Sequence, residues 1–265
     1  MKAEKIQGTQ VIQRTFTLLR LLADNQDQGL RIVDMAKQCQ IHAPTVHRII
    51  AALIAEQMVV RDKHSRRYRL GPMAFELGSS ASPSFNLLEL CSPSLQRLAQ
   101  TSGDTSFLFL RRGNDTVCID RTLGGFSIQT PVVTVGSRQP LGVNAGGLAI
   151  LLAMAEDEVR LVLDAVSPRL DIYGNCDVLD IKRAINHSLE LGYAVIGERA
   201  VPGVTAMGLA ILSPSGSPVA ALTLAATTGR LTRERQAELL PVLREEVKYV
   251  ENLLYESENE QARVD

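Results

Sequence analysis

The stretch GLRIVDMAKQCQIHAPTVHRIIAALIAEQMVVRDKHSRRYRLG, residues 29–71, decides how the first part of the chain folds. Apolar residues within positions 32–36 predict a short helix that ends near Gln40. After a brief turn, apolar residues recur every three or four positions across 46–54 and predict a longer helix, with Pro44 in its first turn. Two short helices joined by a turn of about three to four residues, the second helix longer, are typical of a helix-turn-helix.

The flanking segments extend this pattern to a winged domain. Upstream, residues 11–23 predict an amphipathic helix. Downstream, residues 58–61 and 68–71 read as two strands of a hairpin, which is the position of a wing. The apolar face of the upstream helix comprises Ile12, Phe16, Leu19 and Leu22. The cations and histidine of the hairpin are Lys63, His64, Arg66, Arg67 and Arg69. Such a basic wing suits phosphate oxygens or a narrow minor groove.

The second helix of the motif is the expected reader of DNA. Because its apolar side packs inward, its outer and N-terminal surface is left for the major groove, where Thr45 and Arg48 can meet bases or phosphates and Ala43 a thymine methyl. The alternative is a three-helix packing module whose basic hairpin is merely solvated. The predicted DNA contacts are Ala43, Pro44, Thr45, His47, Arg48, Lys63, Arg66 and Arg67.

The net charge of −1 conceals an uneven distribution. Residues 1–80 contain twelve Lys and Arg against seven Asp and Glu, a net charge of +5, and the remaining 185 residues carry −6. A small basic domain followed by a larger acidic one indicates that the first part meets a polyanion. Because a patch of this size is also common on a merely solvated face, the charge supports DNA binding only together with the helix order.

Composition narrows the protein class. Hydrophobic residues make up 45% and charged residues 22% of the 265-residue chain, which is typical of a soluble globular protein. The longest apolar run, residues 148–155, is far shorter than the ~20 residues that cross a bilayer. The N-terminal segment lacks an apolar signal, so we expect a cytoplasmic protein without a membrane partner. The four cysteines form no CxxC pair, and we expect neither a metal site nor a disulfide.

Several segments closely resemble the IclR family of bacterial transcription regulators. The segments that carry the resemblance are, in order, 29–36, 45–53, 68–71, 192–195, 202–204 and 230–232. The resemblance implies a dimer through the N-terminal domains and a second domain similar to the GAF and PAS sensors. At residues 42–44 this chain has His-Ala-Pro where the family more usually has Pro-Lys-Ser. Because these positions touch DNA in the family, the resemblance does not specify the operator sequence.

A small polar stretch at residues 79–84 marks the expected boundary between a domain of residues 1–80 and one of residues 81–265. Such a linker suits the transmission of a rotation between domains and equally suits a passive tether. Elements of both types follow without regular βαβ repetition, which favours an α+β fold, an antiparallel sheet with helices packed on it. We expect helices at 73–80, 87–99, 144–155, 156–166, 177–191 and 232–254, and strands at 105–111, 116–121, 127–135, 193–198, 205–212 and 219–226. Ser92-Pro93 can start or kink a turn in the helix at 87–99, and Pro241 is expected to kink the helix at 232–254.

The second domain lacks the common enzyme signatures. It contains no G-x-S-x-G elbow, P-loop, G-x-G-x-x-G or H-E-x-x-H motif. Its single histidine, His187, falls on a predicted helix, so the usual Ser-His or Cys-His base is missing. We therefore expect no catalytic residue and no cofactor. An enzyme acting on a small carboxylate, with a basic accessory domain, stays as a rival function.

A binding pocket is better supported, at LGVNAGG, residues 141–147. Small residues leave the amides at a helix N-terminus accessible, and the positive end of the helix dipole favours a carboxylate. The alternative is that the glycines only permit close packing of the helix against the sheet. In IclR-type regulators this segment lies over the effector pocket, so the resemblance implies the same place here.

Two departures from the family bear on the ligand. Where members that bind small keto acids carry an acidic residue after Gly-Tyr-Ala-Val, this chain has Ile196, and where they carry a cysteine it has Ala206, followed by Met207. These apolar groups favour a larger or more apolar ligand, such as an aromatic or hydrophobic carboxylate, and a pocket that has lost its ligand is the alternative. The predicted effector-binding residues are Ser127, Gln129, Arg138, Asn144, Ala145, Gly146, Ile196, Ala206 and Met207.

These patterns together predict a sequence-specific DNA-binding transcription regulator whose operator affinity is modulated by a small organic acid. One recognition helix reads only a few base pairs, so we expect a homodimer or homotetramer on a pseudo-palindromic operator. A DNA-binding assembly protein without a ligand is the second rival to this interpretation.

Overall fold

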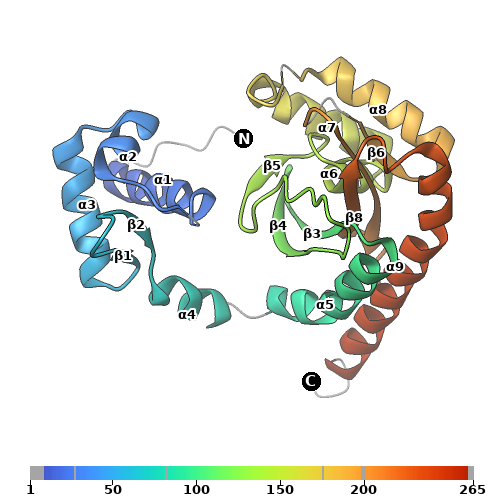
Figure 1. Cartoon of the computed structure of the whole chain (residues 1–265), viewed down its shortest axis with the longest axis horizontal. Coiled ribbons are helices and arrows are strands. Elements are labelled where there is room, and N and C mark those ends of the chain that lie inside the picture. The colour runs from blue at the N-terminus through green and yellow to red at the C-terminus, as the bar shows by residue number, and fades with distance from the viewer. Residues whose placement is uncertain (1–8, 27, 81–82, 175, 198–200, 262–265) are drawn as a thin grey trace. The chain divides into compact units, whose positions relative to one another are not determined.

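The chain forms two compact units. The structure, a computed structural model, describes residues 9–26, 28–80, 83–174, 176–197 and 201–261. The units are Met1–Phe85, drawn in blue to cyan in Figure 1, and Asn86–Asp265, drawn in green to red. The division falls a few residues beyond the expected domain end at Ser80. Residues 81–82 of the expected linker lie outside the described part, and its remaining residues belong to the ends of two helices.

Unit 1 is a helix-turn-helix followed by a hairpin, which confirms the predicted fold. Its elements are α1 (Gln10–Asp24), α2 (Ile32–Cys39), α3 (Ala43–Ala55), β1 (Val59–Arg61), β2 (Tyr68–Leu70) and α4 (Pro72–Ser80). Gln40, with a left-handed φ of 53°, ends α2 and begins the turn to α3. The helices enclose one aliphatic core, whose fully or almost fully buried members include Leu18, Leu22, Met35, Val46 and Ile50.

The hairpin is bonded to the backbone that precedes α2. β1 and β2 pair antiparallel, with Arg61 opposite Tyr68. The Leu30 amide donates to the Tyr68 carbonyl at 3.0 Å, and the Tyr68 amide donates back to Leu30 at 2.7 Å. Gly29 makes this approach possible, because its φ is +64° and a Cβ there would lie 2.9 Å from the Tyr68 carbonyl oxygen. The position of the wing is therefore set by the residues that start the helix-turn-helix.

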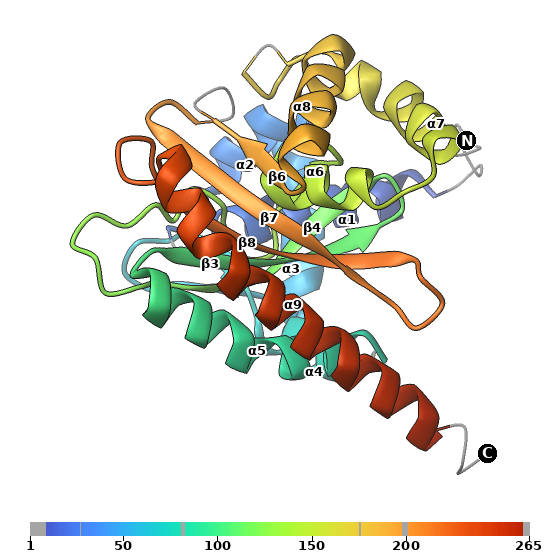
Figure 2. The same cartoon turned by 90° about the vertical axis from the view of Figure 1, so that its right-hand side faces the viewer.

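Unit 2 is a three-layer α+β domain, in agreement with the predicted class. Its six strands are all antiparallel, in the order β5-β4-β3-β8-β7-β6. Its elements are α5 (Pro83–Ser102), β3 (Thr105–Arg112), β4 (Asp115–Thr122), β5 (Arg138–Pro140), α6 (Ala145–Leu152), α7 (Glu156–Val166), a 3-10 turn (Ser167–Arg169), α8 (Val178–Leu191), β6 (Ala194–Ile196), β7 (Val204–Leu212), β8 (Pro218–Thr227) and α9 (Arg233–Gln261). Figure 2 shows α5 and α9 on one face of the sheet and α6 and α8 on the other.

Two aliphatic cores hold these layers together. One lies between the sheet and the pair α5 and α9, and includes Leu95, Leu98 and Leu243. The other lies between the sheet and α6 to α8, and includes Leu148 and Ile150. Every residue of α6 from Ala145 to Leu151 is buried, so this helix is held by apolar contacts on all sides. Its N-terminus is thereby fixed above the sheet.

The expected strand at residues 127–135 is a loop, and that prediction was wrong. Alternating apolar residues produced the strand signal, but Pro131 cannot donate to a ladder. Thr130 instead donates its hydroxyl to the Ala225 carbonyl at 2.8 Å. The strand next to β4 is the short β5, which the sequence pattern did not indicate.

The two internal prolines do not interrupt their helices. α5 continues through Pro93 and α9 through Pro241. Both helices pack their apolar faces on the sheet, and this burial outweighs the hydrogen bond that each proline removes. Of the expected strand at 193–198, Glu198 lies outside the described residues.

Candidate DNA interface and effector pocket

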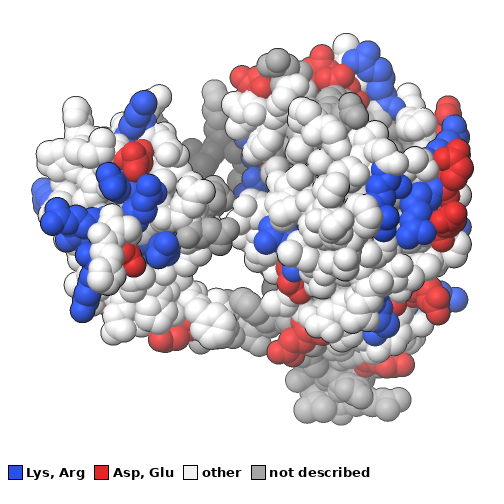
Figure 3. All heavy atoms as spheres, viewed as in Figure 1, with Lys and Arg blue, Asp and Glu red and all other residues white. Residues whose placement is uncertain are grey.

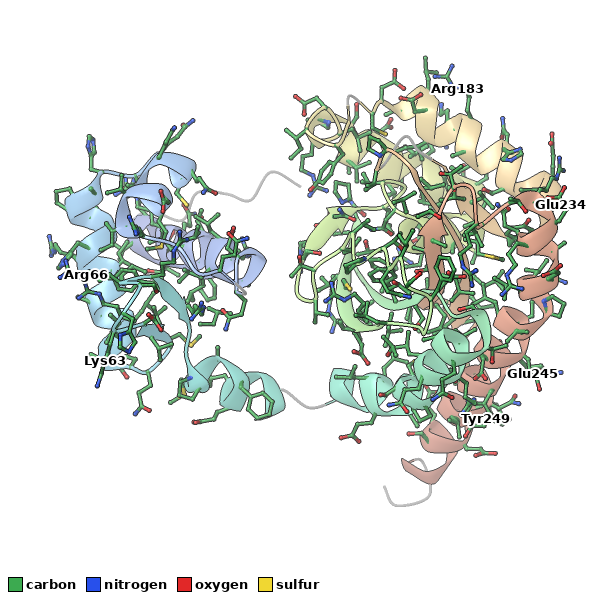
Figure 4. The ribbon with its side chains drawn as sticks, in the orientation of Figure 1. Lys63, Arg66, Arg183, Glu234, Glu245 and Tyr249 are labelled. Atoms are coloured by element: carbon green, nitrogen blue, oxygen red, sulfur yellow. The ribbon has the colours of Figure 1, made fainter. Side chains whose placement is uncertain are left out.

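Asp62 organises the turn of the wing. Its Oδ1 accepts from the amides of His64 at 3.1 Å and Ser65 at 2.6 Å, and from the Ser65 hydroxyl at 2.8 Å. The two bonds from Ser65 are the main reason that the pKa of Asp62 lies below its ordinary value. Arg66 adopts a left-handed φ of 57°. This defined turn directs Lys63 and Arg66 outward, as Figure 4 shows.

The three predicted cations of the wing have different surroundings. Lys63 and Arg66 are exposed and form no ion pair within the described part of the chain. Figure 3 shows lysine and arginine gathered on this face of unit 1. Arg67 is half-buried, and its Nη1 donates to the Gly29 carbonyl at 2.8 Å. Arg67 therefore braces the wing, whereas Lys63 and Arg66 remain available to an anionic partner.

α3 presents one continuous polar and small-residue surface. Its exposed outer positions are Ala43, Pro44, His47, Arg48 and Ala51. Ala51 was not among the predicted contacts, although helical spacing places it on the same face as Pro44 and Arg48. Thr45 is half-buried and lines a hollow of about 360 Å³ together with Val11 and Thr15 of α1. Its side chain thus lies on the flank of this surface nearest α1.

Unit 2 contains a cavity of about 220 Å³ between the sheet and the N-terminal end of α6. Phe107 and Phe109 of β3 contribute to its floor, with ring centroids 5.9 Å apart. Its lining comprises Phe107, Phe109, Val132, Val133, Gln139, Val143, Asn144, Ala145, Ile172, Tyr173, Gly174, Ile196, Gly197, Val201, Val204, Ala206, Thr223 and Ala225. None of these described lining side chains is charged, so the described lining is apolar with a few neutral polar groups.

Asn144 fixes the polar end of the cavity. As the N-cap of α6 it accepts from the Gly147 amide at 2.7 Å. Its Nδ2 donates to the Thr116 hydroxyl at 3.0 Å and to Gln139 Oε1 at 2.7 Å. These three hydrogen bonds fix the orientation of the Asn144 side chain. The first-turn amide of Ala145, like every N-terminal helical amide, has no partner inside the helix.

Two lining residues carry donors that the protein leaves unused. The Thr223 side chain belongs to a residue that is only 2% exposed, and its hydroxyl has no hydrogen-bond partner among the described residues. Gln139 accepts from Asn144, but its Nε2 has no partner in the same part of the chain. Donors that line a cavity without a protein partner are available to a ligand or to water. Sequence reasoning missed both, although Thr223 is a lone polar residue within the buried middle of β8.

Four of the predicted effector residues line this cavity: Asn144, Ala145, Ile196 and Ala206. Gly146 lies directly beside them, and a Cβ on it would come within 2.5 Å of the Phe109 ring. Glycine at this position lets α6 approach β3, which supports the packing alternative for that residue. The packing alternative and the pocket are compatible, because the close approach of α6 to β3 also brings the N-terminus of α6 to the cavity.

The structure does not bring the other predicted effector residues into the cavity. Met207 is fully buried in the core on the opposite face of the sheet, because neighbours along β7 alternate between faces. Ser127 is exposed on the loop that follows β4. Arg138 is exposed on β5 and pairs with Asp115 at 3.5 Å.

Gln129 has a structural role in the loop. Its Oε1 accepts from the Thr105 hydroxyl at 2.9 Å and from the Gly124 amide at 3.2 Å. Its Nε2 donates to the carbonyls of Phe126 and Gly103 at 2.6 and 3.1 Å. With both ends of the amide engaged, Gln129 anchors the loop to the start of β3 and does not line the cavity.

The described residues contain neither a metal-binding cluster nor a membrane-spanning helix. No group of three or more His, Cys, Asp and Glu side chains there is placed to hold a metal ion. No helix within them is both long and apolar enough to span a bilayer. All four cysteines carry free thiols. Burial is the largest factor that raises the pKa of both Cys91 and Cys118 to about 12, so these two thiols stay protonated near neutral pH.

Comparison with known proteins places both units in one family. Residues 11–63 match the family model of the IclR helix-turn-helix domain, and residues 80–252 match that of the bacterial transcriptional regulator IclR C-terminal domain. Among curated relatives, the HTH-type transcriptional repressor AllR of Escherichia coli K12 is 27% identical over 237 residues, which cover 88% of this chain and 87% of AllR.

Solved structures of the family share the fold. The Thermotoga maritima IclR aligns with a TM-score of 0.67 and 25% identity over 92% of this chain and 98% of its own. An IclR homologue of Microbacterium hydrocarbonoxydans complexed with 4-hydroxybenzoate aligns with a TM-score of 0.72 and 20% identity over 92% and 99%. With a matching hairpin-bearing helix-turn-helix and a matching second unit, this chain belongs to the IclR family of bacterial transcription regulators.

Proposed function

We propose that this regulator recognises its operator through α3 and the wing, and that a small aromatic carboxylate in the unit 2 cavity changes its operator affinity. The single observation that carries the effector half is the Thr223 hydroxyl, which lines the cavity and has no hydrogen-bond partner in the described part of the chain. A ligand oxygen that accepts from it removes the cost of that unused donor.

On DNA, the exposed first turns of α3 enter the major groove. Arg48 reaches a base edge or phosphate there, Ala43 meets a thymine methyl, and Thr45 contacts the strand on the α1 side. Lys63 and Arg66 reach phosphates or a narrow minor groove from the wing. Their exposure and lack of ion pairs within the described part of unit 1 support this assignment.

The chemistry of the cavity supports a carboxylate on an aromatic ring. Its volume of about 220 Å³ exceeds the ~150 Å³ of an apolar cavity known to take benzene. The carboxylate accepts from the Ala145 amide, from Gln139 Nε2 and from the Thr223 hydroxyl, at the positive end of the α6 dipole. The 4-hydroxybenzoate bound by the Microbacterium homologue, which has the same fold, adds support for a ring of this size.

Two copies of the chain bind one operator in this proposal. Val11, Ile12 and Phe16 on α1 are 61%, 56% and 52% exposed, although the sequence pattern placed the last two on the buried face. A cluster of exposed large apolar side chains marks a protein contact, and a second copy with a two-fold axis fits a pseudo-palindromic operator. A homodimer through α1 is the minimum assembly, and a homotetramer adds a contact between copies of unit 2. Either assembly acts in the cytoplasm, where the operator DNA lies.

The ligand acts by preferring one state of the protein over another. It shifts operator affinity only by its own difference in affinity between the DNA-binding state and the other state. Couplings of this kind are typically about 1–3 kcal/mol, or about 5- to 150-fold. The effector therefore need not contact DNA or α3.

A fluorescence-anisotropy titration tests both halves of the proposal. The full chain is titrated on DNA from upstream of its own gene and on scrambled DNA at fixed salt, with and without saturating benzoate. We expect a preference of about 100-fold, which is about 2.7 kcal/mol, and a change of about 5-fold or more with benzoate. Equal affinity for both DNAs contradicts the operator half. A preference that no aromatic carboxylate changes contradicts the effector half.

A further inference from the structure

Among the described residues that line the cavity of unit 2, polar groups gather around the buried α6 N-terminus, and the most exposed large side chains are aliphatic. The residues around the α6 N-terminus are almost inaccessible to solvent, with Asn144 8%, Ala145 3% and Thr223 2% exposed. The lining residues that reach the surface are different in kind. Val132 is 39% and Ile172 75% exposed, although both line the cavity.

The apolar mouth is built from separate segments. Val132 comes from the loop after β4, and Ile172 from the segment between the 3-10 turn and α8. Val201, which is half-buried, precedes β7. Single exposed aliphatic side chains are common on this protein, but the convergence of these three on one cavity leaves apolar surface that an occupant can cover.

We propose that the effector is an amphiphilic aromatic carboxylate, whose carboxylate and ring occupy the buried end and whose apolar substituent passes out between Val132 and Ile172. This inference rests on the proposed function, because it takes the carboxylate at the α6 N-terminus as given. It adds the part of the ligand that points to the mouth. A para-alkyl benzoate is the simplest molecule of this class.

The distribution of donors explains why the substituent is apolar. The unused donors of Thr223 and Gln139 lie on lining residues that also hold or flank the α6 N-terminus. Val132, Ile172 and Val201 supply no side-chain donor or acceptor at the mouth. A hydroxyl that lies against them loses water without gaining a partner, whereas an alkyl group gains contact.

The affinities of a homologous series of 4-alkylbenzoates test directly whether the mouth of the cavity binds an apolar substituent. A fully buried methylene contributes ~0.8 kcal/mol, which corresponds to about fourfold in affinity per carbon. Benzoate, 4-methyl-, 4-ethyl- and 4-propylbenzoate are titrated into the full chain by calorimetry. We expect affinity to rise at each step, to about 60-fold between benzoate and 4-propylbenzoate, and 4-hydroxybenzoate to bind more weakly than 4-methylbenzoate.

A pair of variants locates the effect. Ile172→Ser removes apolar surface at the mouth, and because the side chain is 75% exposed the fold is not at risk. Leu161→Ser on α7 is the matched control, since Leu161 is 68% exposed and does not line the cavity. The ratio of 4-propylbenzoate to benzoate affinity should fall several-fold in Ile172→Ser and stay at the wild-type value in Leu161→Ser.

The outcomes separate this inference from the function on which it rests. Benzoate binding with no gain, or a loss, along the alkyl series overturns the apolar mouth and leaves the carboxylate site standing. A gain that Ile172→Ser does not reduce also overturns it, because the substituent then lies elsewhere. Absence of binding by every carboxylate overturns the proposed effector site together with the inference.

Discussion

At the scale of single residues, Thr223 gives the sharpest test of the pocket, because its effects on stability and on binding have opposite signs. Thr223 is 2% exposed and lines the cavity, and its hydroxyl has no hydrogen-bond partner among the described residues. Replacing it by an isosteric methyl removes an unpaired polar group from the free protein, and removes a donor from the complex.

Thr223→Val is therefore expected to melt at the same temperature as wild type or higher, while its affinity for benzoate falls about 10-fold or more, since hydrogen bonds to charged groups contribute about 1.5–3 kcal/mol. Calorimetric titration and thermal melting measure the two effects. Thr227→Val is the control, a threonine of the same strand outside the cavity lining. Unchanged benzoate affinity in Thr223→Val would remove this hydroxyl from the site.

The proposed function gives Arg48 and Arg66 of unit 1 different roles in DNA binding. Arg48→Ala is expected to weaken operator binding more than random-DNA binding, because its position on α3 brings it to base edges. Arg66→Ala is expected to weaken both DNAs alike and to reduce the salt slope by about 0.9, the value of one phosphate contact. Anisotropy titrations at several salt concentrations distinguish the two. Arg183→Ala on α8, the same charge change in unit 2, serves as control, and equal losses for Arg48 and Arg66 on both DNAs would contradict the division.

At the scale of elements, a partly buried ion pair joins α5 to α9, with the Arg97 side chain 43% and the Glu246 side chain 10% exposed. Arg97 donates Nε and Nη2 to the two carboxylate oxygens of Glu246 at 2.7 and 2.6 Å, and its guanidinium lies 4.8 Å from the centre of the Tyr249 ring. Burial alone would raise the pKa of Glu246, but hydrogen bonds from Arg97 and Ser94 outweigh it and hold the pKa below the ordinary value.

The sign of the pH dependence follows from this lowered pKa. The contribution of the pair to the free energy of unfolding is complete above the ordinary Glu pKa of 4.5 and is lost as pH falls through the lower folded value. We expect urea unfolding of wild type to lose stability from about pH 6 to about pH 3, and Glu246→Gln to be less stable at pH 6 with a smaller loss. Glu245→Gln, on the neighbouring position of the same helix, is the control. An identical pH dependence in Glu246→Gln and wild type would show that the Arg97–Glu246 pair does not contribute to the pH dependence of stability.

At the scale of the whole molecule, the proposed assembly depends on the exposed apolar face of α1 as the contact between copies. Phe16→Asp places a charge in the proposed contact between copies, where two like charges then meet, and should raise the dimer dissociation constant about 100-fold or more. Sedimentation equilibrium measures it. Because Phe16 is 52% exposed, folding should be retained, and Gln13→Asp, on an exposed position of the same helix, checks for nonspecific effects. A dimer of undiminished affinity in Phe16→Asp would move the interface away from α1.

The helix-turn-helix, the wing and the α+β class followed from local patterns in the sequence. Apolar periodicity predicted α1, α2 and α3, because a helix that buries one face has apolar residues every three or four positions. The loop at residues 127–135 shows the limit of the same reasoning. Its alternation resembles a strand, but Pro131 cannot donate to a ladder, and the side chains of Gln129 and Thr130 bind distant backbone carbonyls instead.

The sequence by itself determined the domains, the reading helix and the glycine-rich start of α6, because each rests on residues close together in the chain. The tertiary structure alone decided the contents of the cavity. It placed Thr223 of β8, Gln139 of β5 and Asn144 at the start of α6 around one cavity. It also placed Met207 on the opposite face of the sheet from Ala206. Contacts between distant segments are set by how whole layers pack, and no local pattern records which face of β7 or β8 meets a particular helix.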